Sequence, residues 1–248
     1  MSAILRWSLE AESPAAALRS QGFVIVPAAR LARLAGVTTS TFDAWRPLWD
    51  TLPPDRYLRD GGSYRFRRHS CFVHTGSAGS SGELIQAPHR AHWQPTSYNA
   101  LHGGIERWFE PIDPAMVASA GWRGLLTGLG CQFAEVAAAE HWYIEAHQFR
   151  IDTAAGVGRP TPEGAHRDGV DFVAVILVDR YAVRGGETRV FEADGPHGIR
   201  FVLERPWTAV LLDDARVIHE TTPIQPDAVG GHRDTLVLTY RRGGFQAP

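Results

Sequence analysis

The chain has 248 residues, 44% of them hydrophobic, and a formal net charge of −2 at pH 7. This length and apolar content suffice for one substantial core, and the near-neutral charge leaves no large basic field to hold nucleic acid or an anionic membrane. All 25 of the Lys and Arg positions are arginine, which excludes Schiff-base chemistry and a P-loop lysine.

Cysteine content and the N-terminal residues point to a reducing compartment. Cys71 and Cys131 are too few for a disulfide framework, and no Cys-x-x-Cys motif occurs. Residues 1–14 include Glu10 and Glu12 and do not fit a signal peptide. No apolar stretch reaches the roughly 18 residues of a membrane-spanning helix. We therefore expect a cytoplasmic protein with no membrane partner.

The first part of the chain predicts mixed helix and strand. Residues 15–18 indicate a helix, residues 23–26 a strand, and residues 38–49 a helix that Pro47 kinks or ends. From Ser63 to His74, aromatic and basic residues alternate, as on a strand with one face in water.

Two further helices are predicted upstream of the main strand region. They cover residues 116–127 and 131–139, because Gly128-Leu129-Gly130 is expected to break the helical pattern between them. Gly121 and Gly124 weaken the helical pattern of the first.

The remainder of the chain predicts a series of short strands. They cover residues 142–151, 172–178, 188–191, 199–203, 208–212, 217–222 and 233–241. Short strands separated by glycine turns are typical of a closed or jelly-roll-like architecture. We expect one mainly β domain over residues 1–248, with an α/β N-terminal portion of about residues 1–140 packed on the β core.

A His-x-Asp triplet followed by a distant histidine is the main chemical signal. Asp168 follows His166 by two positions, and His219 comes 51 positions later, after several predicted strands. Two imidazoles and one carboxylate suit a non-haem Fe(II) held on one face. The second triplet, which begins at His232, has no histidine after it, so we interpret His232 as a loop residue.

Arg233 lies 14 positions beyond His219, and Thr235 follows it on the same face of a predicted strand. The planar fork of arginine binds a carboxylate through two parallel hydrogen bonds, and a nearby hydroxyl can add a third. The alternative is an exposed arginine at a strand end that pairs with a neighbouring carboxylate.

Two more pairs of polar residues share a strand face. Gln148 and Arg150 are two positions apart, as are Arg65 and Arg67. If these faces point into the barrel, Gln148 or Arg150 can bind a carboxylate of a cosubstrate or substrate. A solvated edge strand explains each pair about as well.

Together, His-x-Asp, a distant histidine and Arg-x-Ser/Thr resemble the pattern of 2-oxoglutarate-dependent oxygenases. The resemblance narrows to the bacterial 2OG-Fe dioxygenase family, which includes the free L-isoleucine 4-hydroxylases and proteins named for biofilm, stress and motility. It spans about residues 20–242 and is strongest at residues 64–68, 147–151, 162–173 and 185–188.

The resemblance implies a double-stranded β-helix, also called a jelly-roll or cupin-like fold. It implies Fe(II), 2-oxoglutarate and O2 as cofactors, with His166, Asp168 and His219 as metal ligands and catalytic residues. Arg233 and Thr235, with Gln148 and Arg150, are the expected cosubstrate residues. Because related halogenases lack the carboxylate ligand, Asp168 favours hydroxylation.

Three functions are compatible with these features. The first is hydroxylation of an aliphatic carbon of a small molecule, a free L-amino acid or a close derivative, whose carboxylate needs a cation from Arg65, Arg67 or Arg150. The second is a non-catalytic protein that binds metal or 2-oxoglutarate and senses stress or biofilm state. The third, hydroxylation of a protein side chain, needs a peptide groove of which the sequence shows no clear sign.

Overall fold

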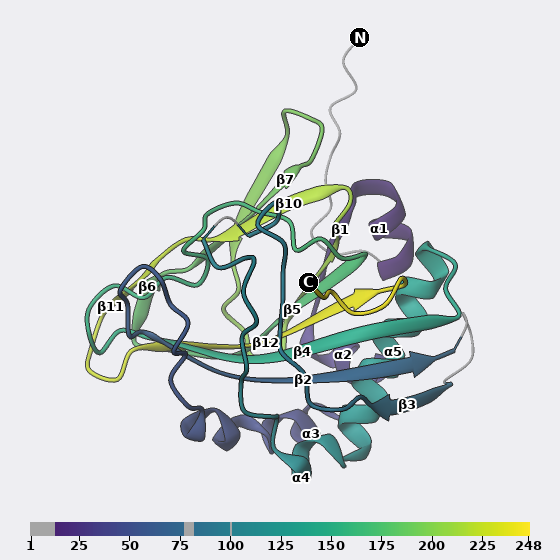
Figure 1. Cartoon of the computed structure of the whole chain (residues 1–248), viewed down its shortest axis with the longest axis horizontal. Coiled ribbons are helices and arrows are strands. Elements are labelled where there is room, and N and C mark those ends of the chain that lie inside the picture. Colours follow the sequence, from purple (N-terminus) through teal and green to yellow (C-terminus); the bar gives the residue numbers. More distant parts are fainter. Residues whose placement is uncertain (1–12, 77–81, 100) are drawn as a thin grey trace.

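The computed structural model describes residues 13–76, 82–99 and 101–248 (Figure 1). Its helices are α1 (Pro14–Gln21), α2 (Ala28–Leu34), α3 (Thr39–Asp43), the 3-10 helix η1 (Arg46–Thr51), α4 (Pro114–Val117) and α5 (Ala120–Val136). Its strands are β1 (Phe23–Val26), β2 (Arg65–Thr75), β3 (Glu83–Gln86), β4 (His141–Asp152), β5 (Phe172–Tyr181), β6 (Val183–Gly185), β7 (Glu187–Glu192), β8 (Gly198–Val202), β9 (Ala209–Asp213), β10 (Val217–Thr221), β11 (Ile224–Pro226) and β12 (His232–Arg241).

The strands form one large and two small antiparallel sheets. The large sheet has seven strands in the order β1-β9-β5-β12-β4-β2-β3, and the smaller ones have the orders β10-β7-β8 and β11-β6. The long strands β4 and β12 run side by side through the centre of the large sheet (Figure 1). This arrangement confirms the predicted mainly β, jelly-roll-like fold.

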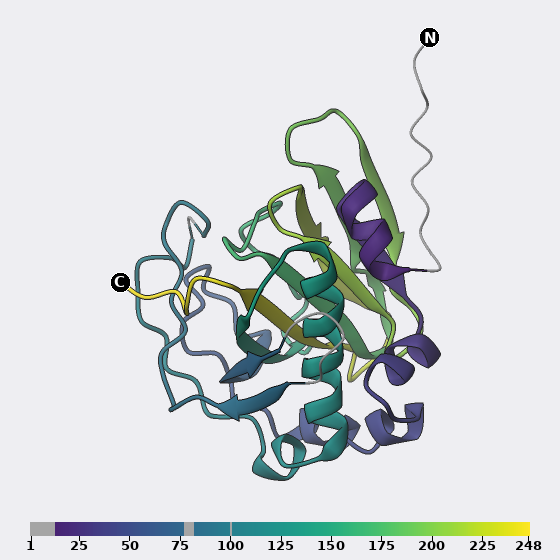
Figure 2. The ribbon, with the colours of Figure 1, turned by 90° about the vertical axis from the view of Figure 1, so that its right-hand side faces the viewer.

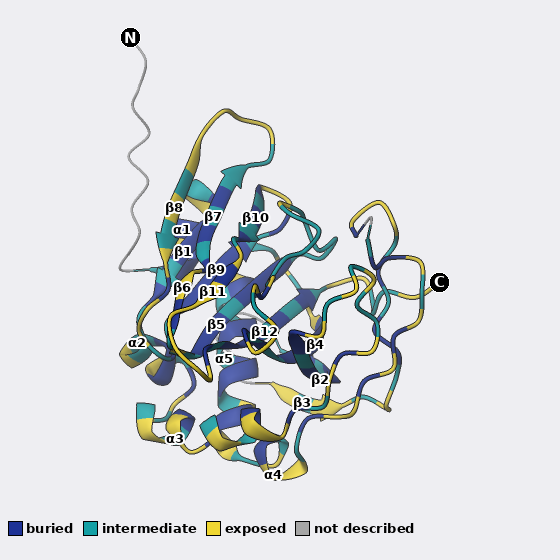
Figure 3. Ribbon diagram, turned by 90° about the vertical axis from the view of Figure 1, so that its left-hand side faces the viewer, coloured by how far each residue is buried: buried dark blue, intermediate teal, exposed yellow. Residues whose placement is uncertain are grey.

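The large sheet is covered on both faces. The helices pack on one face (Figure 2), where fully buried residues such as Trp122 and Trp142 form the larger apolar core. On the other face, a smaller cluster that includes Val173, Leu177 and Val190 joins the large sheet to the three-stranded sheet. The central strands are therefore buried on both sides, and Figure 3 shows their dark, buried ribbons between more exposed loops.

Side chains alternate between the two faces of each central strand, so neighbouring residues have different surroundings. On β12, Leu236, Leu238 and Tyr240 point into the helix-covered core. The intervening positions, Arg233 and Thr235 among them, point to the opposite face. The helix-covered face of β12 is apolar from Leu236 to Tyr240, while the other face can hold polar groups.

The first third of the chain extends the large sheet as well as covering it. Strand β1 pairs with β9 at one edge, and β2 pairs with β4 toward the other edge. Helix α3 ends at Asp43 and η1 begins at Arg46, so the single helix predicted over residues 38–49 is interrupted before Pro47. Pro47 lies in the first turn of η1, where its missing N–H breaks no hydrogen bond.

Helix α5 corrects the expectation of two helices. It runs without interruption through Gly128-Leu129-Gly130. Gly124 and Gly128 allow α5 to pack closely against the end of α2, because a Cβ at Gly124 would lie 2.0 Å from Ala35 O and one at Gly128 would lie 2.2 Å from Leu34 O. Their cost in helix propensity is offset by this contact with the end of α2. No helix among the described residues, α5 included, is long and apolar enough to cross a membrane.

Candidate functional site

Two histidines that are distant in sequence meet through a backbone bridge. His166 lies in the loop between β4 and β5, and His219 lies on β10. Hydrogen bonds of 3.0 Å run from His166 N to His219 O and from His219 N to His166 O. This bridge brings the two imidazole rings to a centroid distance of 4.8 Å.

Asp168 lies against both imidazoles. Its Oδ1 is 3.7 Å from His166 Nε2, and its Oδ2 is 3.7 Å from His219 Nε2. One ligand atom from each of the three residues lies within 4.8 Å of the others. Two nitrogens and one carboxylate at this spacing can hold a transition-metal ion and leave other positions open. The structure thus brings together the three residues that the sequence suggested as ligands.

Hydrogen bonding and burial orient both histidines for metal binding. His166 Nδ1 lies 2.9 Å from Gly164 O, and because a carbonyl only accepts, Nδ1 donates, so that in the neutral ring the lone pair is on Nε2. Burial alone would lower the pKa of His166, but the carboxylates of Asp168 and Glu163 outweigh it and raise the pKa, so a metal competes with a proton for Nε2. Burial lowers the pKa of His219 to about 3, so this imidazole is neutral at pH 7. His219 Nδ1 is buried without a hydrogen-bond partner among the described residues.

Asp214 shapes the loop that contains Asp168. Its buried carboxylate accepts hydrogen bonds from the backbone N–H groups of Asp168 (3.0 Å), Gly169 (2.8 Å) and Val170 (3.1 Å). Gly169 has φ +76°, a left-handed conformation that glycine adopts without strain. Sequence reasoning missed Asp214. The neighbouring Asp171 does not take this role and accepts hydrogen bonds from Arg242.

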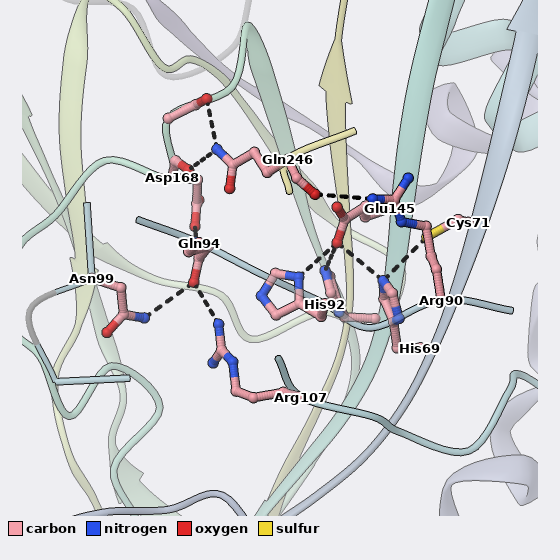
Figure 4. A network of polar contacts seen from close by, with 12 residues as sticks. His69, Cys71, Arg90, His92, Gln94, Asn99, Arg107, Glu145, Asp168 and Gln246 are labelled. Carbon is pink, nitrogen blue, oxygen red and sulfur yellow. Dashed lines mark hydrogen bonds and ion pairs between the residues drawn. The ribbon is translucent and has the colours of Figure 1, made fainter. Parts of the chain in front are cut away.

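A second polar chain orients the Asp168 side chain. Gln94 Nε2 donates to Asp168 Oδ1 at 3.2 Å (Figure 4). Gln94 Oε1 in turn accepts from Arg107 Nη2 at 3.0 Å and from Asn99 Nδ2 at 3.1 Å. These donors fix which end of the amide faces the carboxylate. Gln94 was also missed, since no local motif marks it.

Arg233 and Thr235 line the same cavity as the His-Asp-His group. Arg233 is only 3% exposed, and its Nε and Nη2 have no hydrogen-bond acceptor in the described part of the chain. Burial lowers the pKa of Arg233 to about 10, which still leaves it charged at pH 7. A buried guanidinium with unused donors is suited to bind the carboxylate of a ligand.

Gln148 and Arg150 do not reach this cavity, which contradicts the expectation that they bind the cosubstrate. They lie on the helix-covered face of β4, where Gln148 is fully buried with its Nε2 3.7 Å from Met116 Sδ. Arg150 donates two hydrogen bonds, of 2.8 and 2.7 Å, to the carboxylate of Asp234. The cavity-facing residues of β4 are instead the odd-numbered ones, Glu145 and His147 among them.

Arg65 and Arg67 do face the cavity. Arg65 Nε donates to Asp55 Oδ2 at 2.7 Å in a buried ion pair. The Arg67 guanidinium lies between the rings of Phe109 and Phe149, 3.8 and 4.4 Å from their centroids. The sequence allowed these two arginines to point into the barrel or to lie on a solvated edge strand, and the structure shows that they point inward.

A family model and solved structures match the chain. The model described as 2OG-Fe dioxygenase matches residues 46–239. No curated protein matches the chain. The crystal structure of a BsmA homologue from Methylobium petroleophilum PM1 shares 58% identity, with a TM-score of 0.89 over 95% of this chain and 94% of that one.

Two more distant structures share the fold. IDO from Bacillus thuringiensis is 16% identical with a TM-score of 0.73, over 93% of this chain and 94% of that chain. The Fe(II)/α-ketoglutarate-dependent dioxygenase TqaL is 17% identical with a TM-score of 0.68, over 92% and 85%. At these identities the likeness concerns the fold alone.

Replacing Asp214 with Asn should weaken metal binding without unfolding the protein. The amide keeps one acceptor oxygen but turns an NH2 group toward backbone N–H donors, which loosens the Asp168 loop. Loss of such a supporting contact typically costs 10–100-fold in metal affinity, and anaerobic Fe(II) titration would measure it. Asp171→Asn is the control, expected to keep its affinity; equal losses in both variants would contradict a specific role for Asp214.

Proposed function

The chain belongs to the 2OG-Fe dioxygenase family, and from that premise we propose that it hydroxylates an aliphatic carbon of a free L-amino acid or a close derivative. It is a 2-oxoglutarate-dependent dioxygenase, whose family uses Fe(II), 2-oxoglutarate and O2. The observation that supports the substrate proposal is a single cavity. It is lined by a candidate metal-binding group, by Arg233, whose Nε and Nη2 have no acceptor among the described residues, and by further buried charges of both signs.

In this proposal His166, Asp168 and His219 hold the iron. Bound Fe(II), together with 2-oxoglutarate and O2, supplies the oxidant that inserts an oxygen atom into a C–H bond. The chain positions the ligands through the backbone bridge between the two histidines and through the contacts of Asp214 and Gln94 with the Asp168 loop. Its other task is to hold the substrate carbon in place and to exclude bulk water.

Arg233 and Thr235 are proposed to hold the distal carboxylate of 2-oxoglutarate. Both are buried on the cavity face of β12, and Arg233 has two donors without an acceptor among the described residues. An uncompensated buried charge is unfavourable, and a bound carboxylate would relieve that cost. The hydroxyl of Thr235, on the same strand face, can add a hydrogen bond.

The substrate carboxylate is proposed to bind at Arg65 and Arg67. Arg65 Nη2 and Arg67 Nε are buried donors without an acceptor in the described part of the chain. Their guanidinium groups are held in place by Asp55 and by two aromatic rings. Preorganised cations suit a small anionic ligand whose remaining atoms extend toward the iron.

Alanine at any proposed iron ligand should abolish Fe(II)-dependent turnover of 2-oxoglutarate. A three-ligand site loses most of its metal affinity when one ligand is removed. The variants are His166→Ala, Asp168→Ala and His219→Ala, measured by iron content and succinate formation. His232→Ala is the control, because its Nε2 lies 3.4 Å from Asp179 and outside the cavity. Loss of iron in the control with retention in His219→Ala would refute the assignment.

Arg233→Ala should weaken 2-oxoglutarate binding while iron still binds. Loss of a buried, charge-assisted pair typically costs roughly 2–5 kcal/mol. Calorimetric titration of the metal-loaded variant with 2-oxoglutarate measures the effect. Arg150→Ala is a matched control, since Arg150 is also on a central strand but pairs with Asp234 on the other face. Unchanged affinity in Arg233→Ala would move the carboxylate site elsewhere.

A panel of free L-amino acids tests the substrate. We expect an aliphatic member to gain one oxygen atom by mass spectrometry, with succinate formed in proportion, and we expect activity to be lost when the substrate carboxylate is converted to an amide. If no member is oxidised and succinate stays at the uncoupled background, the free-amino-acid proposal fails. A non-catalytic sensor of metal or 2-oxoglutarate, or a derivative substrate, would then be favoured.

A further inference from the structure

Three histidines surround a buried carboxylate at the β2–β4 side of the cavity (Figure 4). Glu145 Oε2 lies 2.6 Å from His92 Nδ1, 3.0 Å from His69 Nε2 and 3.8 Å from His147 Nε2. Glu145, His92 and His147 line the cavity, and His69 packs against His147. Neither the metal group nor the proposed 2-oxoglutarate site uses these residues.

At neutral pH this cluster has one negative charge. Burial lowers the pKa of His92 to about 3, and it also lowers the pKa values of His69 and His147. Burial alone would raise the pKa of Glu145, but His92 and the hydrogen bonds from His69 and His92 outweigh it and hold that pKa well below its usual range. The carboxylate is therefore ionised and the imidazoles are neutral.

The four residues also lie close enough together to suggest a second metal site, but their geometry opposes it. The ring nitrogens of His69, His92 and His147 all face the same carboxylate oxygen, Glu145 Oε2, and the two shorter contacts are hydrogen bonds to that oxygen, so the point on which the nitrogens converge is already occupied. Arg67 Nη2 lies 2.8 Å from His147 Nδ1. Because a guanidinium only donates, the His147 proton is on Nε2, which points toward Glu145. The cluster is thus a set of N–H donors around a carboxylate.

We propose that Glu145 binds the ammonium group of the substrate, so that the cavity recognises a zwitterionic α-amino acid. This rests on the proposed function and supplies the acceptor that the arginines cannot provide. All three histidine contacts use Oε2, which leaves Oε1 of this cavity-lining residue for a ligand. Arg65 Nη2, Arg67 Nε and Arg107 Nε are cavity-lining donors that have no acceptor among the described residues.

The local charge balance supports a zwitterion over a simple cation or anion. Three guanidinium groups, of Arg65, Arg67 and Arg107, interact with three carboxylates, of Asp55, Glu145 and Glu163. These charges balance, so a divalent ion would leave a surplus of positive charge, whereas a zwitterion leaves the net charge unchanged. A carboxylic acid without the amino group would bury Glu145 Oε1 without giving it a hydrogen-bond donor.

The first test uses the unmodified protein and pairs of ligands. L-Isoleucine and L-leucine are compared with the des-amino carboxylic acids that have the same carbon chains. Binding is measured calorimetrically without oxygen, with Mn(II) and 2-oxoglutarate bound, and oxidation is measured with Fe(II) in air. We expect each amino acid to bind at least about 100-fold more tightly than its des-amino partner, because a site built to bind a polar group rejects an analogue that lacks it. Equal affinities would overturn the proposal.

The second test uses Glu145→Gln. The amide oxygen can still accept from His69 and His92, while its NH2 replaces the oxygen offered to the ammonium group. Amino-acid affinity should fall at least about 30-fold, and the preference over the des-amino acid should disappear. Affinity for 2-oxoglutarate and the melting temperature, which report folding, should change little. Glu140→Gln, at an exposed position just before β4, is the control and should match the unmodified protein.

The outcomes separate this inference from the proposed function. If amino acids bind in a way that depends on Glu145 but are not oxidised, the hydroxylase proposal is refuted and the ammonium site is retained. Oxidation of an amino acid that Glu145→Gln leaves unaffected would do the reverse, and no binding or oxidation of either amino acid would count against both. Metal analysis adds one more check: a second equivalent of metal per chain that Glu145→Gln removes would show that the cluster is a metal site.

Discussion

Two-residue alternation along the buried central strands is the constraint on which the site depends. Helices cover one face of strands β4 and β12. The other face lines the cavity and lies on the side of the smaller, three-stranded sheet. Each strand must therefore supply apolar or paired side chains to the first face and functional groups to the second. Leu236 and Leu238 serve the core, while Arg233 and Thr235 serve the cavity. A shift of register by one residue would exchange these roles.

The proposed iron ligands depend on a different feature, the loop before β5, which is hydrogen-bonded both to the three-stranded sheet and to Asp214 after β9 of the large sheet. The main-chain bridge between His166 and His219 joins the loop before β5 to the three-stranded sheet. Asp214 then satisfies three consecutive backbone N–H groups of that loop. Backbone groups that are all bonded resist rearrangement, so the ligand positions are set before a metal binds.

The remaining cavity wall concentrates buried charge, and this has a structural cost. Arg65, Arg67 and Arg233 retain donors without acceptors among the described residues, although each is buried. Such groups destabilise a folded protein unless a ligand completes them. The same wall holds Glu145 ionised between neutral imidazoles. The cations and the carboxylate that line this one cavity are the basis of our proposal for a small ligand with both charges.

The strand series and the mainly β fold could be predicted from the sequence because period-two hydrophobicity is a local property of the chain, and the grouping of His166, Asp168 and His219 could be predicted from the order and spacing of the motif. Which strand face points inward depends on how the sheets and helices pack, and alternation along one strand does not specify it. On β4, polar residues occur on both faces, so alternation could not separate Gln148 and Arg150 from Glu145 and His147. Gly128 of α5 was misinterpreted as part of a helix break, because the contact that requires a glycine there, with the end of α2, lies about 90 residues away along the chain. Asp214 was missed because its three hydrogen bonds join segments that are separate in sequence and meet only in the folded protein.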